Sequence, residues 1–140
     1  MNTNLLTILL QLAGLAHLGL ICAGMLMPRV VGLRGHLASL PEFIRRLFWV
    51  YYLFIGLCLV GFGSLTFTLA GTLAGGGALA RALCLFLAVF WTLRLVAATF
   101  IFDLSPYLSN GYRRLGYHAT NIVFIFRPVI YLLAAWKGGV

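Results

Sequence analysis

The sequence predicts an all-α integral membrane protein, a four-helix transmembrane bundle with up-down topology. Of its 140 residues, 63% are hydrophobic and 9% are charged, whereas soluble proteins carry about 25% charged residues. Four apolar stretches are long enough to cross a bilayer, which takes about 20 helical residues. Their connections are short, so residues 1–140 are expected to form a single transmembrane domain with spans at about 5–27, 47–70, 81–102 and 117–136.

The first span, 5–27, has no basic residue before it. It therefore lacks the charged leading region of a secretory signal and is expected to be retained. At 100° per residue, Ala13, Gly14 and Gly24 fall on the same side of this helix as His17. Small residues let helices approach closely, so Gly14 and Gly24 are predicted packing positions. The histidine is expected to point into the bundle or at a partner helix.

The connection 28–46 contains Ser-Leu-Pro-Glu at positions 39–42, which has the form of a capping box. We expect Ser39 to cap the first N–H groups of a helix and Glu42 to bond back to it. A helix is therefore predicted to begin in the headgroup region and to continue into the second span. This structural role for Glu42 argues against a catalytic one.

The second span, 47–70, opens with an aromatic belt at one interface, formed by Phe48, Trp49, Tyr51 and Tyr52. Gly56 and Gly63 are seven residues apart, so they lie on one helix face and predict a groove for close helix contact. The glycine-rich segment 71–77 is expected to be a tight, flexible turn.

The third and fourth spans each carry an arginine at a depth that is expensive for a charge. Arg94 lies in the third span and Arg127 in the fourth. A charged side chain at the bilayer centre costs about 2.5–3.5 kcal/mol on insertion scales. Trp91 is expected to cover the guanidinium of Arg94 as a cation–π partner. Tyr131, one turn after Arg127, is placed to hydrogen-bond whatever Arg127 binds.

A proline follows the arginine of the fourth span. Pro128 has no N–H, so the carbonyl of Phe124 loses its helical donor. Two interpretations stay open. Either Arg127 or a neighbouring polar group satisfies that carbonyl, which is a structural role, or a kink at the proline makes room for a ligand.

The functional hypothesis is one polar pocket inside the bundle, lined by Arg94, Arg127, His17 and Tyr131. The sequence has only two acidic residues, too few to pair both arginines inside the membrane. Two arginines suit an anionic group, such as a lipid phosphate, a haem propionate, a small anion or an acidic residue of another subunit. Alternatively, His17 hydrogen-bonds a quinone carbonyl, or the arginines snorkel with no dedicated partner.

The distribution of Lys and Arg orients the chain. The first and third connections hold six of these residues, namely Arg29, Arg34, Arg45, Arg46, Arg113 and Arg114. The opposite side holds Arg81 and Lys137. The positive-inside rule therefore puts both basic connections in the cytoplasm and both termini on the non-cytoplasmic side of a bacterial inner membrane. Arg-Arg-Leu introduces both the second and the fourth span, which hints at two related hairpins.

The net charge of +8 does not predict nucleic-acid binding, because the basic residues are strung along span ends rather than gathered in a domain. Anionic lipids are the natural counter-charges.

Cys22, Cys58 and Cys84 lie one to a span without a CxxC pair, so neither redox nor zinc chemistry is predicted. His17 and His118 differ in depth by about 15 Å, which argues against their ligating one haem iron.

No enzyme is predicted, because paired carboxylates, HExxH, GxSxG and a phosphate loop are all missing from the sequence. The first expectation is a non-catalytic membrane subunit, a scaffold or accessory of a larger assembly or homo-oligomer, whose intramembrane arginines pair with a partner or lipid. The alternative is a protein that binds or conducts an anionic lipid, quinone or anion through an Arg94/Arg127 pocket. A third is a quinone- or cofactor-contacting subunit of an electron-transfer complex, with His17 and Trp91 near the ligand. No cofactor is predicted beyond bound lipid or quinone.

Overall fold

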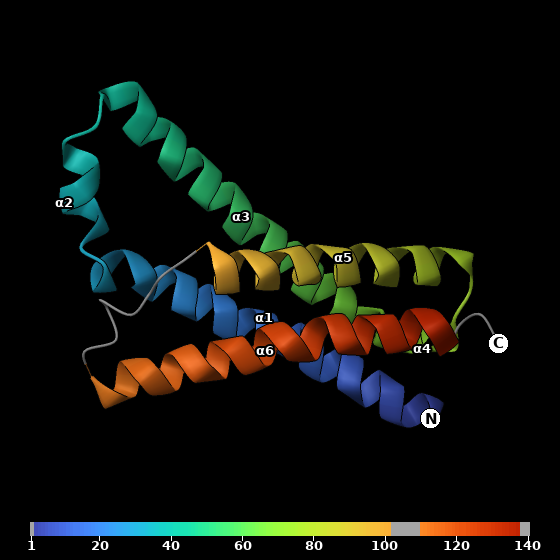
Figure 1. Cartoon of the computed structure of the whole chain (residues 1–140). Coiled ribbons are helices and arrows are strands. Elements are labelled where there is room, and N and C mark those ends of the chain that lie inside the picture. Colours follow the sequence, from blue (N-terminus) through green and yellow to red (C-terminus); the bar gives the residue numbers. More distant parts are fainter. Residues whose placement is uncertain (1, 102–109, 138–140) are drawn as a thin grey trace.

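A computed structural model describes residues 2–101 and 110–137, and within them the only regular structure is helical (Figure 1). The four long helices are α1 (Thr3–Val30), α3 (Glu42–Thr68), α5 (Ala78–Phe100) and α6 (Gly111–Lys137). Two six-residue helices lie between them, α2 (Leu33–Ala38) and α4 (Ala70–Gly75). Each long helix is long and apolar enough to cross a membrane. The predicted four-helix transmembrane bundle is confirmed.

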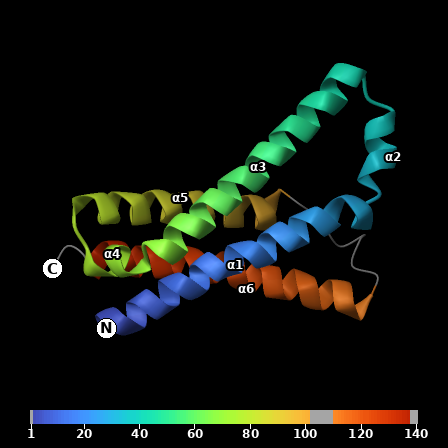
Figure 2. The same ribbon diagram turned by 180° about the vertical axis from the view of Figure 1, so that it is seen from behind.

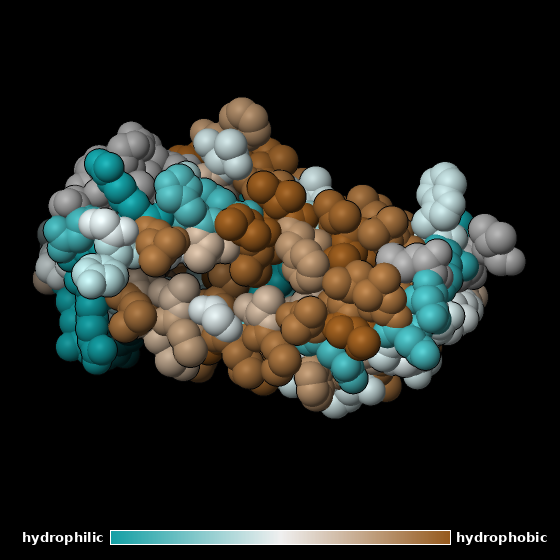
Figure 3. Space-filling view, turned by 90° about the horizontal axis from the view of Figure 1, so that it is seen from below, coloured by the Kyte–Doolittle hydropathy of each residue, from teal (hydrophilic) through white to brown (hydrophobic). Residues whose placement is uncertain are grey.

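Successive long helices run in opposite directions (Figures 1 and 2). The start of α1, the short helix α4 and the end of α6 lie at one end of the molecule, and α2 lies at the other. A hydrogen bond of 3.2 Å from Lys137 Nζ to Thr3 Oγ1 joins the first turn of α1 to the last turn of α6. An apolar band separates the two polar ends on the face seen in Figure 3. The topology is therefore up-down, as expected.

The long helices pack as two hairpins, α1 with α3 and α5 with α6, and the hairpins meet where α1 lies against α6. At the α1–α3 crossing the backbones touch. A Cβ added to Gly63 would lie 2.8 Å from His17 Cβ, and one added to Gly14 would lie 2.9 Å from the backbone nitrogen of Phe67. Toward its N-terminus, α3 diverges from α5 and α6 (Figure 1). It consequently buries only 11% of its most apolar stretch, compared with 39% for α6.

The other two glycines singled out as packing positions do not bring helices together. A Cβ on Gly56 would meet no atom within 4 Å, and one on Gly24 would meet only the Tyr52 hydroxyl, at 4.0 Å. The face shared by Gly56 and Gly63 is therefore in close contact only at Gly63. Near Gly24 the helices have already separated enough for the Tyr52 side chain to lie between them.

Helix α1 continues through Pro28 to Val30 instead of ending at residue 27. Because Pro28 has no N–H, the carbonyl of Gly24, four residues earlier, has no helical donor. The Tyr52 hydroxyl on α3 donates a hydrogen bond to that carbonyl. A side chain of the neighbouring helix thus satisfies the group that the proline leaves open.

The predicted capping box at residues 39–42 is wrong. Ser39 has a helical backbone, with φ −78° and ψ −9°, whereas an N-cap residue needs an extended one. Its hydroxyl instead donates to the carbonyl of His36 at 2.9 Å and closes α2. Pro41, with φ −50° and ψ 143°, is the N-cap of α3. Glu42 forms an ion pair with Arg46, one turn further on.

The segment expected to be a glycine turn is largely helical. Helix α4 covers Ala70–Gly75 and packs against α1, where it buries Ala70, Leu73 and Ala74. The reversal of the chain is confined to Gly76 and Gly77, with φ +82° and +112°. These backbone angles favour glycine because it has no Cβ.

Candidate functional site

Four large side chains gather where the two hairpins meet. His17 on α1 and Trp91 on α5 are each 1% exposed, and Arg127 and Tyr131 on α6 are each 0% exposed. We call these four residues the Arg127 cluster. All four are among the site residues predicted from the sequence, and the structure brings them together.

Arg127 is the most unusual member of the cluster. Its Cζ atom lies 4.1 Å from the centroid of the Trp91 ring, within the range of a cation–π contact. Its Nε, Nη1 and Nη2 atoms make no hydrogen bond to any of the described residues. A guanidinium carries five N–H donors, and a charge buried without partners is costly. The described ranges contain one acidic residue, Glu42, which pairs with Arg46.

His17 adds an acceptor to the cluster. Its Nδ1 lies 2.8 Å from the carbonyl of Ala13, one turn back. Because a carbonyl only accepts, Nδ1 carries the proton and leaves Nε2 of the neutral ring as an acceptor. Nε2 has no partner within residues 2–101 and 110–137, and neither does the indole Nε1–H of Trp91. The two rings pack edge to face, with centroids 5.2 Å apart.

Tyr131 holds the second hairpin against α3. Its hydroxyl lies 2.8 Å from Thr66 Oγ1, and Thr66 in turn donates to the carbonyl of Phe62 at 2.7 Å. Tyr131 is therefore the donor to Thr66 and keeps a lone pair for a further bond. No signal in the sequence singles out Thr66, since a threonine in a membrane helix commonly bonds to its own preceding turn.

Arg94 lies outside the cluster, contrary to the expected pocket with two arginines. It is exposed on α5, and its Cζ lies 5.7 Å from the centroid of the Phe124 ring. Trp91 covers Arg127 rather than Arg94. The reason is geometric: residues three apart on a helix differ by about 60° in direction. With Trp91 turned toward α6, Arg94 lies at the edge of the hairpin.

The proposed bond from Arg127 to the carbonyl freed by Pro128 is also wrong. All three Arg127 nitrogens lack a partner in the part of the chain that the structure describes, because the guanidinium extends across to the Trp91 ring. Helix α6 nevertheless continues through Pro128 to Lys137. The proline therefore does not account for the arginine.

No group of three His, Cys, Asp or Glu residues that could hold a metal ion occurs among the residues described. Cys22 and Cys58 are exposed on α1 and α3, and Cys84 is buried in α5. The comparison of this chain with protein-family models, curated proteins and solved structures returns no match.

The open hydrogen-bonding groups define what the cluster can bind. They are mainly donors, the guanidinium of Arg127 and the indole N–H of Trp91, with Nε2 of His17 and a lone pair of the Tyr131 hydroxyl as acceptors. A guanidinium presents a planar fork of N–H groups that matches the oxygens of a phosphate or carboxylate. Because donors outnumber acceptors and the guanidinium is positively charged, the arrangement suits an anionic group better than a cation.

Proposed function

We propose that this protein is a membrane-embedded binding protein that holds an anionic group against Arg127, between the α1–α3 and α5–α6 hairpins. One observation carries the proposal. The Arg127 guanidinium is 0% exposed, and within the described residues none of its nitrogens has a hydrogen-bond partner. An anion would neutralise this charge and accept N–H bonds that the fold otherwise leaves unmade.

The Arg127 cluster is buried, so an anion can reach it only when the helices around it move. Because Arg127 and Tyr131 are each 0% exposed, the anion enters when the hairpins part or while the helices assemble. Opening must then break the contact between α1 and α6 and the hydrogen bond between Thr66 of α3 and Tyr131 of α6. Release is then slow, and the group remains bound through a gentle extraction.

The test is the mass of the intact full chain, extracted in mild detergent and measured by native mass spectrometry. We compare the wild type with Arg127→Gln and with the control Arg94→Gln, which removes the same charge from the exposed face of α5. The wild type and Arg94→Gln are expected to retain a bound anionic species, and Arg127→Gln is expected to lose it. Equal retention by Arg127→Gln would refute the proposal. So would a wild type that carries no such species and gains no thermal stability from phosphatidylglycerol, inorganic phosphate or chloride.

The exposed face of α3 favours a second candidate function, a non-catalytic scaffold or accessory subunit of a larger assembly or homo-oligomer. Helix α3 buries the smallest share of its apolar stretch among the four spans. Its exposed large apolar side chains include Phe43, Leu53, Phe54, Ile55 and Leu57. Another membrane helix packed there would replace lipid contacts by protein contacts. A defined set of other subunits, or several copies of this chain, in the extracted particle would support this function, and a lone chain would contradict it.

We infer a bacterial inner membrane as the location, with both termini on the non-cytoplasmic side. The excess of Arg at the α2 end supports this orientation through the positive-inside rule. In a cysteine-free background, a membrane-impermeant maleimide added to intact cells should label Lys137→Cys but not Arg34→Cys. The opposite labelling would reverse the orientation.

A further inference from the structure

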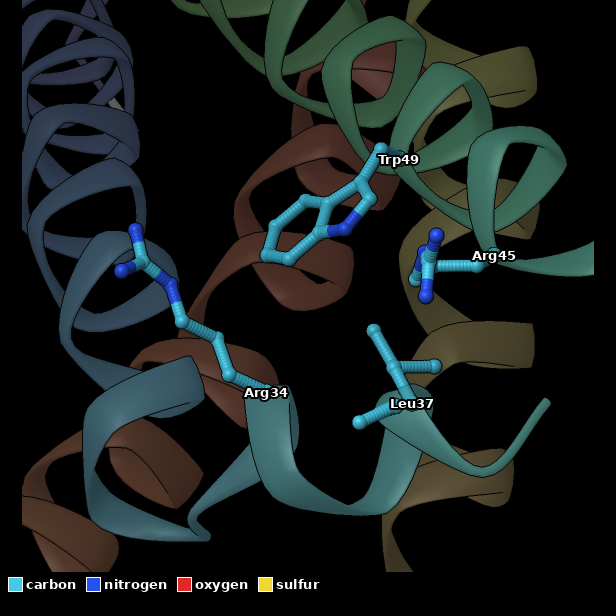
Figure 4. Close-up of a pocket in the computed structure, with 5 residues that line it drawn as sticks. Arg34, Leu37, Arg45 and Trp49 are labelled. Carbon is cyan, nitrogen blue, oxygen red and sulfur yellow. The ribbon is translucent and has the colours of Figure 1, made fainter. Parts of the chain in front are cut away.

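A hollow of about 300 Å³ lies at the α2 end of the molecule, and it shares no residue with the Arg127 cluster. It opens to the surface, and its walls come from two helices. Figure 4 shows the Arg34 and Arg45 side chains on opposite sides, with the Trp49 ring between them and Leu37 below. The lining residues are Arg34, Leu37 and Ala38 of α2, and Arg45 and Trp49 of α3.

The short connection between α2 and α3 places the two helices on either side of the hollow. Helix α2 ends where the Ser39 hydroxyl bonds to the carbonyl of His36, and α3 begins at Glu42 after a short reversal. Leu37 is 5% exposed and anchors α2. Arg45 lies in the first turn of α3, so its half-buried side chain meets the hollow from the side facing Arg34.

The hollow carries two positive charges that the described part of the chain does not neutralise. Neither Arg34 nor Arg45 takes part in an ion pair there, since Glu42 pairs with Arg46 instead. That pair lies on the outside, with side chains 63% and 76% exposed, respectively. Figure 4 draws the two side chains on opposite sides of the hollow, with the Arg34 guanidinium turned away from Arg45, so an anion in the hollow would be attracted by positive charge on both sides.

We propose that this hollow binds a phosphate group at the membrane surface. Arg45 donates to the phosphate oxygens from one side, and the exposed Arg34 side chain rotates toward the hollow to donate from the other, as guanidiniums do in charge-assisted pairs. Trp49 and Leu37 form an apolar wall beside the two arginines, and tryptophan side chains are enriched at the depth of the lipid headgroups. A phosphate carried on a lipid uses both parts of the hollow, whereas free phosphate uses only the arginines.

The experiment titrates the purified full chain in detergent with dioctanoyl phosphatidic acid, dioctanoyl phosphatidylcholine or inorganic phosphate, and counts bound molecules by native mass spectrometry. The test variant is the double substitution Arg34→Gln/Arg45→Gln. The control is Arg29→Gln/Arg46→Gln, which removes the same charge from two exposed residues near the same end. Circular dichroism checks that all variants keep their helix content.

We expect phosphatidic acid to bind the wild type more tightly than phosphatidylcholine. The test variant should weaken that binding about tenfold or more, and the control less than about threefold. Inorganic phosphate that binds as tightly as the lipid, with the same loss in the test variant, would assign the hollow to free phosphate. Equal losses in both double variants, no loss in either, or equal binding of phosphatidylcholine would overturn the proposal. The species held at Arg127 should remain in both double variants, which separates this test from that of the proposed function.

Discussion

The α1–α3 crossing supplies the sharpest stability test, the substitution Gly63→Ala. The added Cβ would lie 2.8 Å from His17 Cβ, 3.2 Å from His17 Cγ and 3.3 Å from the carbonyl oxygen of Gly14. Two of these atoms cannot rotate away, because one is bonded directly to a backbone carbon and the other belongs to the backbone. The helices must therefore move apart.

The magnitude follows from two opposing terms. Overpacking of a tight contact costs about 1–3 kcal/mol, and contacts this close to the backbone favour the upper half of that range. Alanine in place of glycine in a helix interior gains about 0.5–1 kcal/mol. The net loss of stability for Gly63→Ala is then about 1–2.5 kcal/mol. The matched control is Gly56→Ala in the same helix, where the Cβ meets nothing within 4 Å. The control should be neutral or slightly stabilised.

The assay is reversible unfolding of the purified chain in mixed micelles titrated with dodecyl sulfate, followed by circular dichroism. Gly63→Ala is expected to unfold at a lower fraction of dodecyl sulfate than wild type, and Gly56→Ala at the same or a higher fraction. If the two variants unfold at the same midpoint, the α1–α3 crossing is not as close as the structure has it.

Three further predictions concern hydrogen bonds and the buried charge, and the same unfolding assay measures all of them. Tyr131→Phe should lower the free energy of unfolding by about 1 kcal/mol. Adding Thr66→Val should lower it little further, since either change removes the 2.8 Å hydrogen bond between the two side chains. Additive losses would contradict that bond. Tyr52→Phe should lower the free energy of unfolding by about 1–3 kcal/mol, because the Gly24 carbonyl, which Pro28 leaves without a helical donor, then loses its hydrogen bond. The loss should be smaller in a Pro28→Ala background, and an unchanged loss would refute this role of Tyr52. Arg127→Met should stabilise the protein, once the bound anion has been removed, by about 1–4 kcal/mol. A loss of stability would mean that the buried charge is already paired.

The fold class and the inward faces followed from local signals in the sequence. Apolar runs of spanning length predicted all four long helices. Helical periodicity turned His17 toward the interior, and the free-energy cost of a charge in lipid did the same for Arg127. These are properties of one helix at a time. The two short helices were not predicted, and α4 replaces the expected glycine turn because its small residues let the chain pack against α1.

The partners of these faces depend on how different helices meet, which local patterns do not encode. Trp91 lies near Arg94 in the sequence but covers Arg127, since α5 packs on α6 with Trp91 at the interface. The hydrogen bond between Thr66 and Tyr131 could not be predicted from either helix alone, because it depends on α3 lying beside α6. The capping box failed for a local reason, because Ser39 was needed to end α2 before α3 began.

The most direct test of the central claim is an experimental structure of the gently extracted protein in lipid nanodiscs, at a resolution that resolves the Arg127 guanidinium. We expect non-protein density within about 3.2 Å of its nitrogens, on the side away from the Trp91 ring. That density should be absent from the Arg127→Gln variant and present in Arg94→Gln. A guanidinium surrounded only by protein atoms, or bonded to the carbonyl of Phe124, would contradict the claim that this bundle holds an anion.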